Sequence, residues 1–436
     1  MQLLTLLLLA AVLCVPLAQR LGLGAIPGYL IAGVLVGPSG LGLVSDVPAI
    51  MVASQWGVVM MLFLVGLELA PARLWAMRRE VFGVGMLQMA GCGLLLGVVF
   101  GLGLRHLAGM SWQAAILCGL SLALSSTAVA LRLLEERGLV RAPLGRSALG
   151  VLLFQDMAAI PMLVAAGLLG SDGTAAPSFG AALVAVAVVA AAYRLRLLDW
   201  AARSQLNEMF TAAALLVVLG TAQLFDSAGL SAGLGGFLVG VLLAESRYRE
   251  ELERTIEPFK GLLLGLFFLA VGMAIDLREA LDYWPYVLLG VLALLGVKVL
   301  VLYGIARLVG LPRYHRLMYA LVLAQGGEFS FAIFSEAWDN HLMTLAQRDL
   351  LAIVVAVSMG VAPVVLKLLE RLPVRYGGIR DMSVRPAGFA DEAARPDADL
   401  SSEAQRPPGA AMQAAADPAS PTAAPPPVSQ SPSPPE

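Results

Sequence analysis

The chain has 436 residues, of which 59% are hydrophobic and 14% are charged, and its mean hydropathy is +0.81. Soluble domains carry about 25% charged residues, so this composition excludes an ordinary soluble protein and indicates a membrane protein. The 29 Lys and Arg residues nearly balance the 31 Asp and Glu residues. The net charge therefore gives no reason to expect a nucleic-acid partner.

Apolar stretches of about 20 residues can cross a bilayer as helices. The chain offers about thirteen of them, which predicts an all-α polytopic membrane protein. The first stretch lacks a basic leading region and a cleavage site, so we expect a retained helix rather than a signal peptide. The predicted spans are residues 2–18, 25–37, 53–70, 84–104, 112–133, 146–169, 179–193, 207–225, 228–244, 259–275, 284–306, 315–335 and 347–369.

The chain divides into two parts of different composition. Residues 1–375 hold all the spans and form the predicted transmembrane domain. Residues 376–436 are rich in Pro and Ala, most strongly from Pro386 onward. Such a composition cannot bury a core, so we expect a disordered tail.

Basic residues predict the orientation in the membrane. Alternate loops collect nearly all of them, and the opposite loops hold only Arg105, Arg278 and Arg348. By the positive-inside rule the rich loops are cytoplasmic. The N-terminus is then outside and the C-terminus inside, which agrees with an odd number of spans.

Three segment pairs predict an inverted repeat. Residues 28–33 resemble 236–241, residues 63–67 resemble 268–273, and residues 122–126 align loosely with 321–325. Each match is weak, but all three are displaced by seven spans. Because seven is odd, the second copy runs through the membrane in the opposite direction. Inverted repeats are typical of transporters whose binding site lies at the midplane.

Two spans carry interruptions near their middles. One contains Ser125, Ser126 and Thr127, whose hydroxyls compete for backbone hydrogen bonds. The other, residues 325–328, reads Gln325-Gly326-Gly327-Glu328, and paired glycines weaken a helix. Two broken helices can cross there, where their C-terminal ends favour a cation and their N-terminal ends favour a carboxylate. The alternative is that both are close-packing seams between intact helices.

Asp156 stands within an otherwise apolar span. A carboxylate at that depth costs several kcal/mol unless it is paired, hydrated or protonated, and it is a functional-site hypothesis by default. An acid that chooses between a proton and a cation is the working group of a proton-coupled transporter. The alternative is a structural carboxylate bonded to neighbouring hydroxyls.

Lys298 is the lysine that lies deep in a span. It precedes Arg307 by nine residues, or roughly 14 Å of helix, and Asp156 follows Arg146 by ten residues, or roughly 15 Å. Acid and amine therefore lie at similar depth, and we expect Lys298 to pair with Asp156 or with Glu328 in a core salt bridge. A lysine that snorkels to the interface is the alternative.

These residues resemble the monovalent cation:proton antiporter-2 family, in particular its Kef-type potassium efflux branch. The resemblance covers residues 1–375 and rests on the motifs FLVGLE at 63–68, SSTA at 125–128, FQDMAAIP at 154–161 and QGGEF at 325–329. It implies a sodium/proton antiporter-like fold, a homodimer and elevator-like movement of a core domain. It also implies that Asp156 binds the cation or proton, with Gln155 as its neighbour and Lys298 as the core lysine.

The chain departs from that branch in two ways. Kef proteins usually continue into a cytosolic nucleotide-binding domain, whereas nothing after residue 380 has a strand–GxGxxG–helix pattern. Sodium-selective relatives carry two adjacent aspartates where this chain has Gln155 and Asp156. The second departure favours potassium over sodium.

We therefore expect a secondary antiporter of the bacterial inner membrane that exchanges K⁺ for H⁺, with no enzymatic step and no cofactor. A monovalent cation would bind Asp156 and Gln155 with help from the Ser126 and Thr127 hydroxyls, and protonation would expel it. A Na⁺/H⁺ antiporter, a gated K⁺ channel, a membrane sensor and a sodium/solute symporter remain alternatives. The expected partners are the lipid bilayer and a second copy of the chain, and a separate cytosolic regulatory subunit remains open.

Overall fold

The computed structural model describes residues 2–21, 23–44, 47–69, 71–170, 197–204, 206–228, 230–276 and 282–371. Every regular element in these ranges is helical, and nine helices or helix pairs there are long and apolar enough to cross a membrane. This confirms the all-α membrane class. Each predicted span coincides with a helix or a pair of half-helices, except 179–193, which lies outside the described residues together with the tail.

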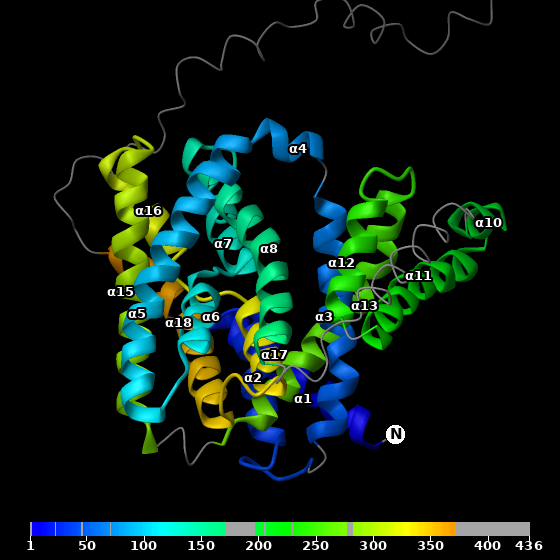
Figure 1. The fold of residues 1–436 in the computed structure, drawn as a ribbon, viewed down its shortest axis with the longest axis horizontal. Coiled ribbons are helices and arrows are strands. Elements are labelled where there is room, and N and C mark those ends of the chain that lie inside the picture. The colour runs from blue at the N-terminus through cyan, green and yellow to red at the C-terminus, as the bar shows by residue number, and fades with distance from the viewer. Residues whose placement is uncertain are drawn as a thin grey trace, which may run out of the picture. The chain divides into compact units, whose positions relative to one another are not determined.

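The elements follow the chain in a simple order, and Figure 1 labels most of them. They are α1 Gln2–Arg20, α2 Ala25–Val36, α3 Val47–Glu68, α4 Pro71–Ala76, the π-helix η1 Arg79–Gly85, α5 Met86–Ala108, α6 Trp112–Ala123, α7 Thr127–Glu135, α8 Pro143–Gly170, α10 Leu197–Arg203, α11 Asn207–Ser227, α12 Ala232–Leu243, α13 Arg249–Ala274, α15 Trp284–Leu308, α16 Arg313–Val322, α17 Phe329–Asp339 and α18 Leu345–Arg371.

The helices pack as two bundles (Figure 1). In the α3 bundle, α3 packs against α12 and α13, α2 packs between α1 and α13, and α11 packs on α12. In the α15 bundle, α15 packs against α5, α16 and α18, α6 packs on α5, and α8 contacts both η1 and α17. The bundles meet where α2 contacts α18 and where α8 contacts α12. The half-helices all belong to the α15 bundle.

Glycines let two pairs of helices in the α3 bundle cross at backbone contact. A Cβ atom added at Gly240 of α12 would lie 2.2 Å from the Phe63 carbonyl oxygen of α3. One added at Gly272 of α13 would lie 2.3 Å from the Leu30 carbonyl oxygen of α2. These crossings join corresponding segments of the predicted repeat, since α3 corresponds to α13 and α12 to α2. Equivalent crossings are what an inverted repeat requires.

We expect Gly240→Ala to lower the melting temperature, because its methyl group would overlap the α3 backbone and force the helices apart. Overpacking of this kind costs about 1–3 kcal/mol. Gly261→Ala in α13 is the control, since nothing lies within 4 Å of a Cβ there, and removing a helical glycine is neutral or stabilising. Equal melting temperatures for the two variants in detergent would contradict the close crossing.

Candidate functional site

Two helices break and cross inside the α15 bundle, as the sequence predicted. The helix α6 ends at Ala123 and α7 begins at Thr127, with extended backbone at Leu124 and at Ser126, which caps α7 by accepting from Val129 N at 3.4 Å. The second break separates α16 from α17 at residues 323–328. The two breaks touch, since a Cβ at Gly327 would lie 3.0 Å from Leu124 Cβ and 3.2 Å from the Ser125 carbonyl carbon.

Lys298 joins the two breaks. Its Nζ donates to the carbonyl oxygens of Leu124 at 2.6 Å and Gln325 at 2.7 Å, and to Ser125 Oγ at 3.0 Å. Leu124 directly follows the end of α6 and Gln325 lies just beyond the end of α16. The ammonium therefore neutralises the negative ends of two half-helices.

The expected salt bridge of Lys298 with Asp156 or Glu328 is wrong for this structure. The three hydrogen bonds to the breaks use all three donors of the ammonium. Free carbonyls at a helix C-terminus are strong acceptors that a sequence pattern does not display. Lys298 is fully buried, so the snorkelling alternative is wrong as well.

Gln155 holds the backbone at the first break through its side-chain amide. Its Oε1 accepts from Ser125 N at 2.8 Å, and its Nε2 donates to Gln88 Oε1 at 2.8 Å and to the Ala123 carbonyl at 3.2 Å. Gln88 Nε2 donates to the same Ala123 carbonyl at 2.9 Å. Both ends of the Gln155 amide thus bind the backbone that α6 leaves open. In this geometry Gln155 positions the break, and its role toward a cation stays a prediction.

Hydroxyl groups support the second break in the same way. Gly326 N donates to Ser358 Oγ at 3.0 Å, and Ser330 Oγ donates to the Ser121 carbonyl at 2.7 Å. The sequence prediction included neither these serines nor Gln88. The available signal was that each is a polar residue within an apolar span, but hydroxyls in spans also bond to their own helix, so the signal does not identify a partner.

Asp156 lies at the middle of α8 and is 8% exposed. The Thr127 hydroxyl faces its carboxylate, and the carboxylates of Glu328 and exposed Glu68 lie within electrostatic range. Glu328 directly precedes α17, and Thr127 is the first residue of α7. Positive helix N-termini therefore border Asp156 and Glu328, while the negative ends meet Lys298.

Three buried oxygens at the crossing have no hydrogen-bond partner among the described residues. They are Thr127 Oγ1, Gln325 Oε1 and Glu328 Oε2. The Ser126 hydroxyl faces the Glu328 carboxylate, and Gln325 Nε2 donates to the Ser126 carbonyl at 3.4 Å. Buried oxygens without a donor are costly unless water or a cation satisfies them. The site therefore offers carboxylate, amide and hydroxyl oxygens, which are ligands for a hard cation.

A cavity of about 380 Å³ lies between the two bundles at the C-terminal end of α8. Its walls include Leu62 of α3, Leu163 of α8 and Phe267 of α13, and its polar lining includes Glu336 and Asp339. Leu163 follows Asp156 by seven residues, or about 10 Å of helix. The cavity lining therefore does not include Asp156.

The family model for "Sodium/hydrogen exchanger, transmembrane" matches residues 6–371. The chain belongs to the sodium/hydrogen exchanger family. Its fold is similar to that of the sodium proton antiporter MjNhaP1 from Methanocaldococcus jannaschii at pH 8, with 17% identity and a TM-score of 0.59 over 84% of this chain and 97% of that one. An electron-microscopy structure of MjNhaP1 matches with a TM-score of 0.52, again at 17% identity, over 84% of this chain and 95% of that one.

Membership in the sodium/hydrogen exchanger family gives the class of transport. The chain is a multi-pass membrane protein and a cation/proton antiporter, not a member of a catalytic enzyme family. The similar solved structures confirm the antiporter-like fold. Family membership gives neither the ion that this chain prefers nor the role of any single residue.

We predict that Lys298→Gln lowers the melting temperature, because two buried helix-end carbonyls lose a charged donor worth about 1.5–3 kcal/mol. Arg307→Gln on the same helix is the control, since Arg307 is exposed. A double-mutant cycle distinguishes a Lys298 that bonds to the breaks from one that pairs with Asp156. If Lys298 serves the breaks, its effect should be nearly the same in an Asp156→Asn background. A strong non-additive effect would instead support an ion pair between Lys298 and Asp156.

Proposed function

We propose that this exchanger carries K⁺ in one direction and H⁺ in the other through competition at Asp156. The observation that supports the proposal most directly is a buried carboxylate at the N-terminal ends of two crossed half-helices. Thr127 and Glu328, which act on this carboxylate, each have an unpartnered buried oxygen, and so does Gln325 at the second break. An intramembrane carboxylate with that surrounding is a site for an ion or a proton.

The mechanism follows from the charge of Asp156. The deprotonated acid binds a partly dehydrated cation, helped by the Thr127 hydroxyl, the Ser126 hydroxyl and the oxygens at the second break. Protonation removes the charge and releases the cation. Exchange is obligatory when only the loaded or the protonated form changes its access. Lys298 remains bonded to the helix ends, so in this proposal it does not exchange partners with Asp156 during the cycle.

The preference for potassium rests on the donor set. Gln155 occupies the place of the second aspartate of sodium-selective relatives, and its amide bonds to the α6 break. The cation would then meet fewer charged oxygens and more neutral ones. A site of lower field strength favours the larger, less strongly hydrated ion. On this ground we propose that the chain belongs to the Kef-type branch.

Alternating access would come from movement of the α15 bundle against the α3 bundle. The half-helices, Asp156 and Lys298 all lie in one bundle, so the site can travel as a unit. The cavity at the far end of α8 would serve as one access route, and exposed Glu68 would border the other. We also propose that the protein is a homodimer in the bacterial inner membrane with its C-terminus in the cytoplasm. The arginine-rich loops would be the docking place for a separate regulatory subunit.

We predict that Asp156→Asn reduces exchange to background in everted vesicles, because Asn keeps the volume and cannot titrate. The melting temperature should remain near the wild-type value. The measurement is the pH change driven by K⁺, Na⁺ or Rb⁺ at equal ionic strength, and wild type should respond most strongly to K⁺. Near wild-type exchange by Asp156→Asn would refute the mechanism, and a stronger response to Na⁺ would refute only the preference.

Glu328→Gln should raise the K⁺ concentration that gives half-maximal exchange, because the site loses a negative charge near Asp156. We expect an effect of about tenfold, which corresponds to about 1.4 kcal/mol. Glu135→Gln is the control, because Glu135 is exposed at the far end of α7. An unchanged K⁺ dependence in Glu328→Gln would remove this acid from the cation site.

A further inference from the structure

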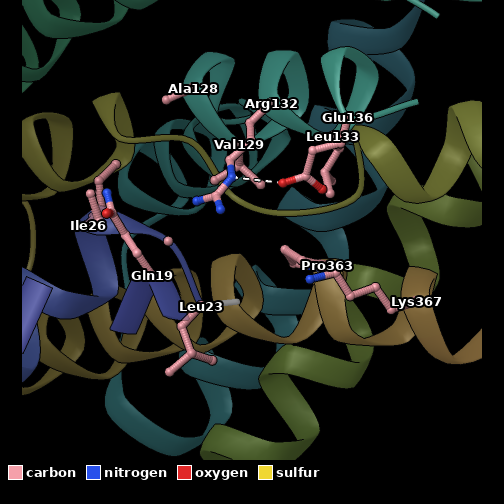
Figure 2. A pocket seen from close by; sticks show the side chains of 12 residues that line it. Gln19, Leu23, Ile26, Ala128, Val129, Arg132, Leu133, Glu136, Pro363 and Lys367 are labelled. Atoms are coloured by element: carbon pink, nitrogen blue, oxygen red, sulfur yellow. Dashed lines mark hydrogen bonds and ion pairs between the residues drawn. The ribbon is translucent and has the colours of Figure 1, made fainter. Parts of the chain in front are cut away.

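A pocket of about 190 Å³ lies between the turn that joins α1 to α2, the helix α7 and the helix α18 (Figure 2). It is separate from the cation site, since none of Asp156, Thr127 and Glu328 lines it. Ala128 and Val129, which directly follow Thr127, do form part of its wall. The turn belongs to the α3 bundle, whereas α7 and α18 belong to the α15 bundle. The pocket therefore spans the boundary between the two bundles.

The lining has an apolar part and a charged part. Leu23, Ile26 and Leu133 form apolar wall, and Arg132 and Lys367 bring positive charge from two different helices. Figure 2 shows both basic side chains at the pocket, with Arg132 joined to Glu136. Glu136 is the acid in the lining, so the lining carries a net charge of +1.

The single acid leaves one cation without compensation. Glu136 Oε1 lies 3.0 Å from Arg132 Nε, and Glu136 Oε2 lies 3.7 Å from Arg137 Nη1. Lys367 forms no ion pair or hydrogen bond within the described part of the chain, and it is exposed. The pocket thus presents an uncommitted ammonium opposite a guanidinium, an arrangement that suits a phosphate group.

The surroundings of the pocket indicate where such a phosphate would come from. Leu13, Leu17 and Leu21 repeat at helical spacing from α1 into the turn and are 62%, 59% and 65% exposed, as expected of a face that meets acyl chains. The pocket opens beside the end of α1, on the side where the arginine-rich loops predict the cytoplasmic leaflet. An apolar wall with basic tips at that level matches a lipid with a charged head.

We propose that this pocket binds the phosphodiester headgroup of an anionic phospholipid, with Lys367 and Arg132 on the phosphate and the apolar wall against the upper acyl chain. A bound lipid contacts both bundles, so it stabilises the arrangement in which the pocket is formed. Lipid composition then adjusts how readily the bundles move past each other. This site is independent of which monovalent cation is carried.

The test uses the full-length protein in phosphatidylcholine vesicles with and without added phosphatidylglycerol. Phosphatidylglycerol should raise the melting temperature of wild type. Lys367→Gln should shift the phosphatidylglycerol fraction for half the effect upward about tenfold, as expected when a hydrogen bond from a charged donor to the phosphate is lost. Glu136→Gln should shift it downward, because Arg132 then loses its competing carboxylate.

Arg307→Gln is the matched control, since it removes an exposed basic residue on the same predicted side without touching the pocket. It should retain the wild-type response. An equal loss in Arg307→Gln and Lys367→Gln would show general surface attraction and overturn the proposal. A second arm adds inorganic phosphate to phosphatidylcholine vesicles. Stabilisation equal to that by phosphatidylglycerol would identify a soluble anion and overturn the lipid assignment.

Discussion

The buried ammonium of Lys298 is the interaction on which the centre of this protein depends. Two half-helices end near the middle of the bundle, and their last carbonyls have no partners within their own helices. In a membrane protein no bulk water compensates for such groups. Lys298 satisfies a carbonyl from each helix and a serine hydroxyl between them. The crossing can therefore persist at a depth where broken backbone is otherwise costly.

With the negative helix ends assigned to Lys298, the positive ends are free to act on ions. Asp156 and Glu328 lie by the starts of α7 and α17, where a helix favours negative charge. The two kinds of helix end at one crossing therefore meet groups of opposite charge. Lys298 lies at the negative ends, and Asp156 and Glu328 lie by the positive ones.

The two bundles meet different demands. The α3 bundle is held by glycine crossings in which backbone touches backbone, and these leave little freedom to slide. The α15 bundle carries the breaks, where Gln88, Gln155 and Ser358 bond to backbone groups that the half-helices leave open. A bundle that bonds these backbone groups internally can move as a body without exposing them to lipid. Both cavities lie at the boundary between the bundles.

The sequence by itself determined the features that depend on local composition. Apolar length located the spans, and the residue types at 125–127 and 325–328 located the breaks. The cost of charge in a span singled out Asp156 and Lys298, because that cost is a property of the residue and its depth. The weak inverted repeat was also visible, because corresponding segments need small residues at equivalent helix crossings.

Only the tertiary structure decided which groups meet. Lys298 bonds to Leu124, 174 positions away, and to Gln325 rather than to an acid. Gln155 bonds to Ser125 and to Gln88, a polar residue in a span whose partner the sequence did not indicate. Hydrogen bonds last over only a few ångströms and have strict geometry, so two groups at equal depth need not be partners. Depth can be read from a sequence, but the direction in which a side chain points depends on how the helices cross.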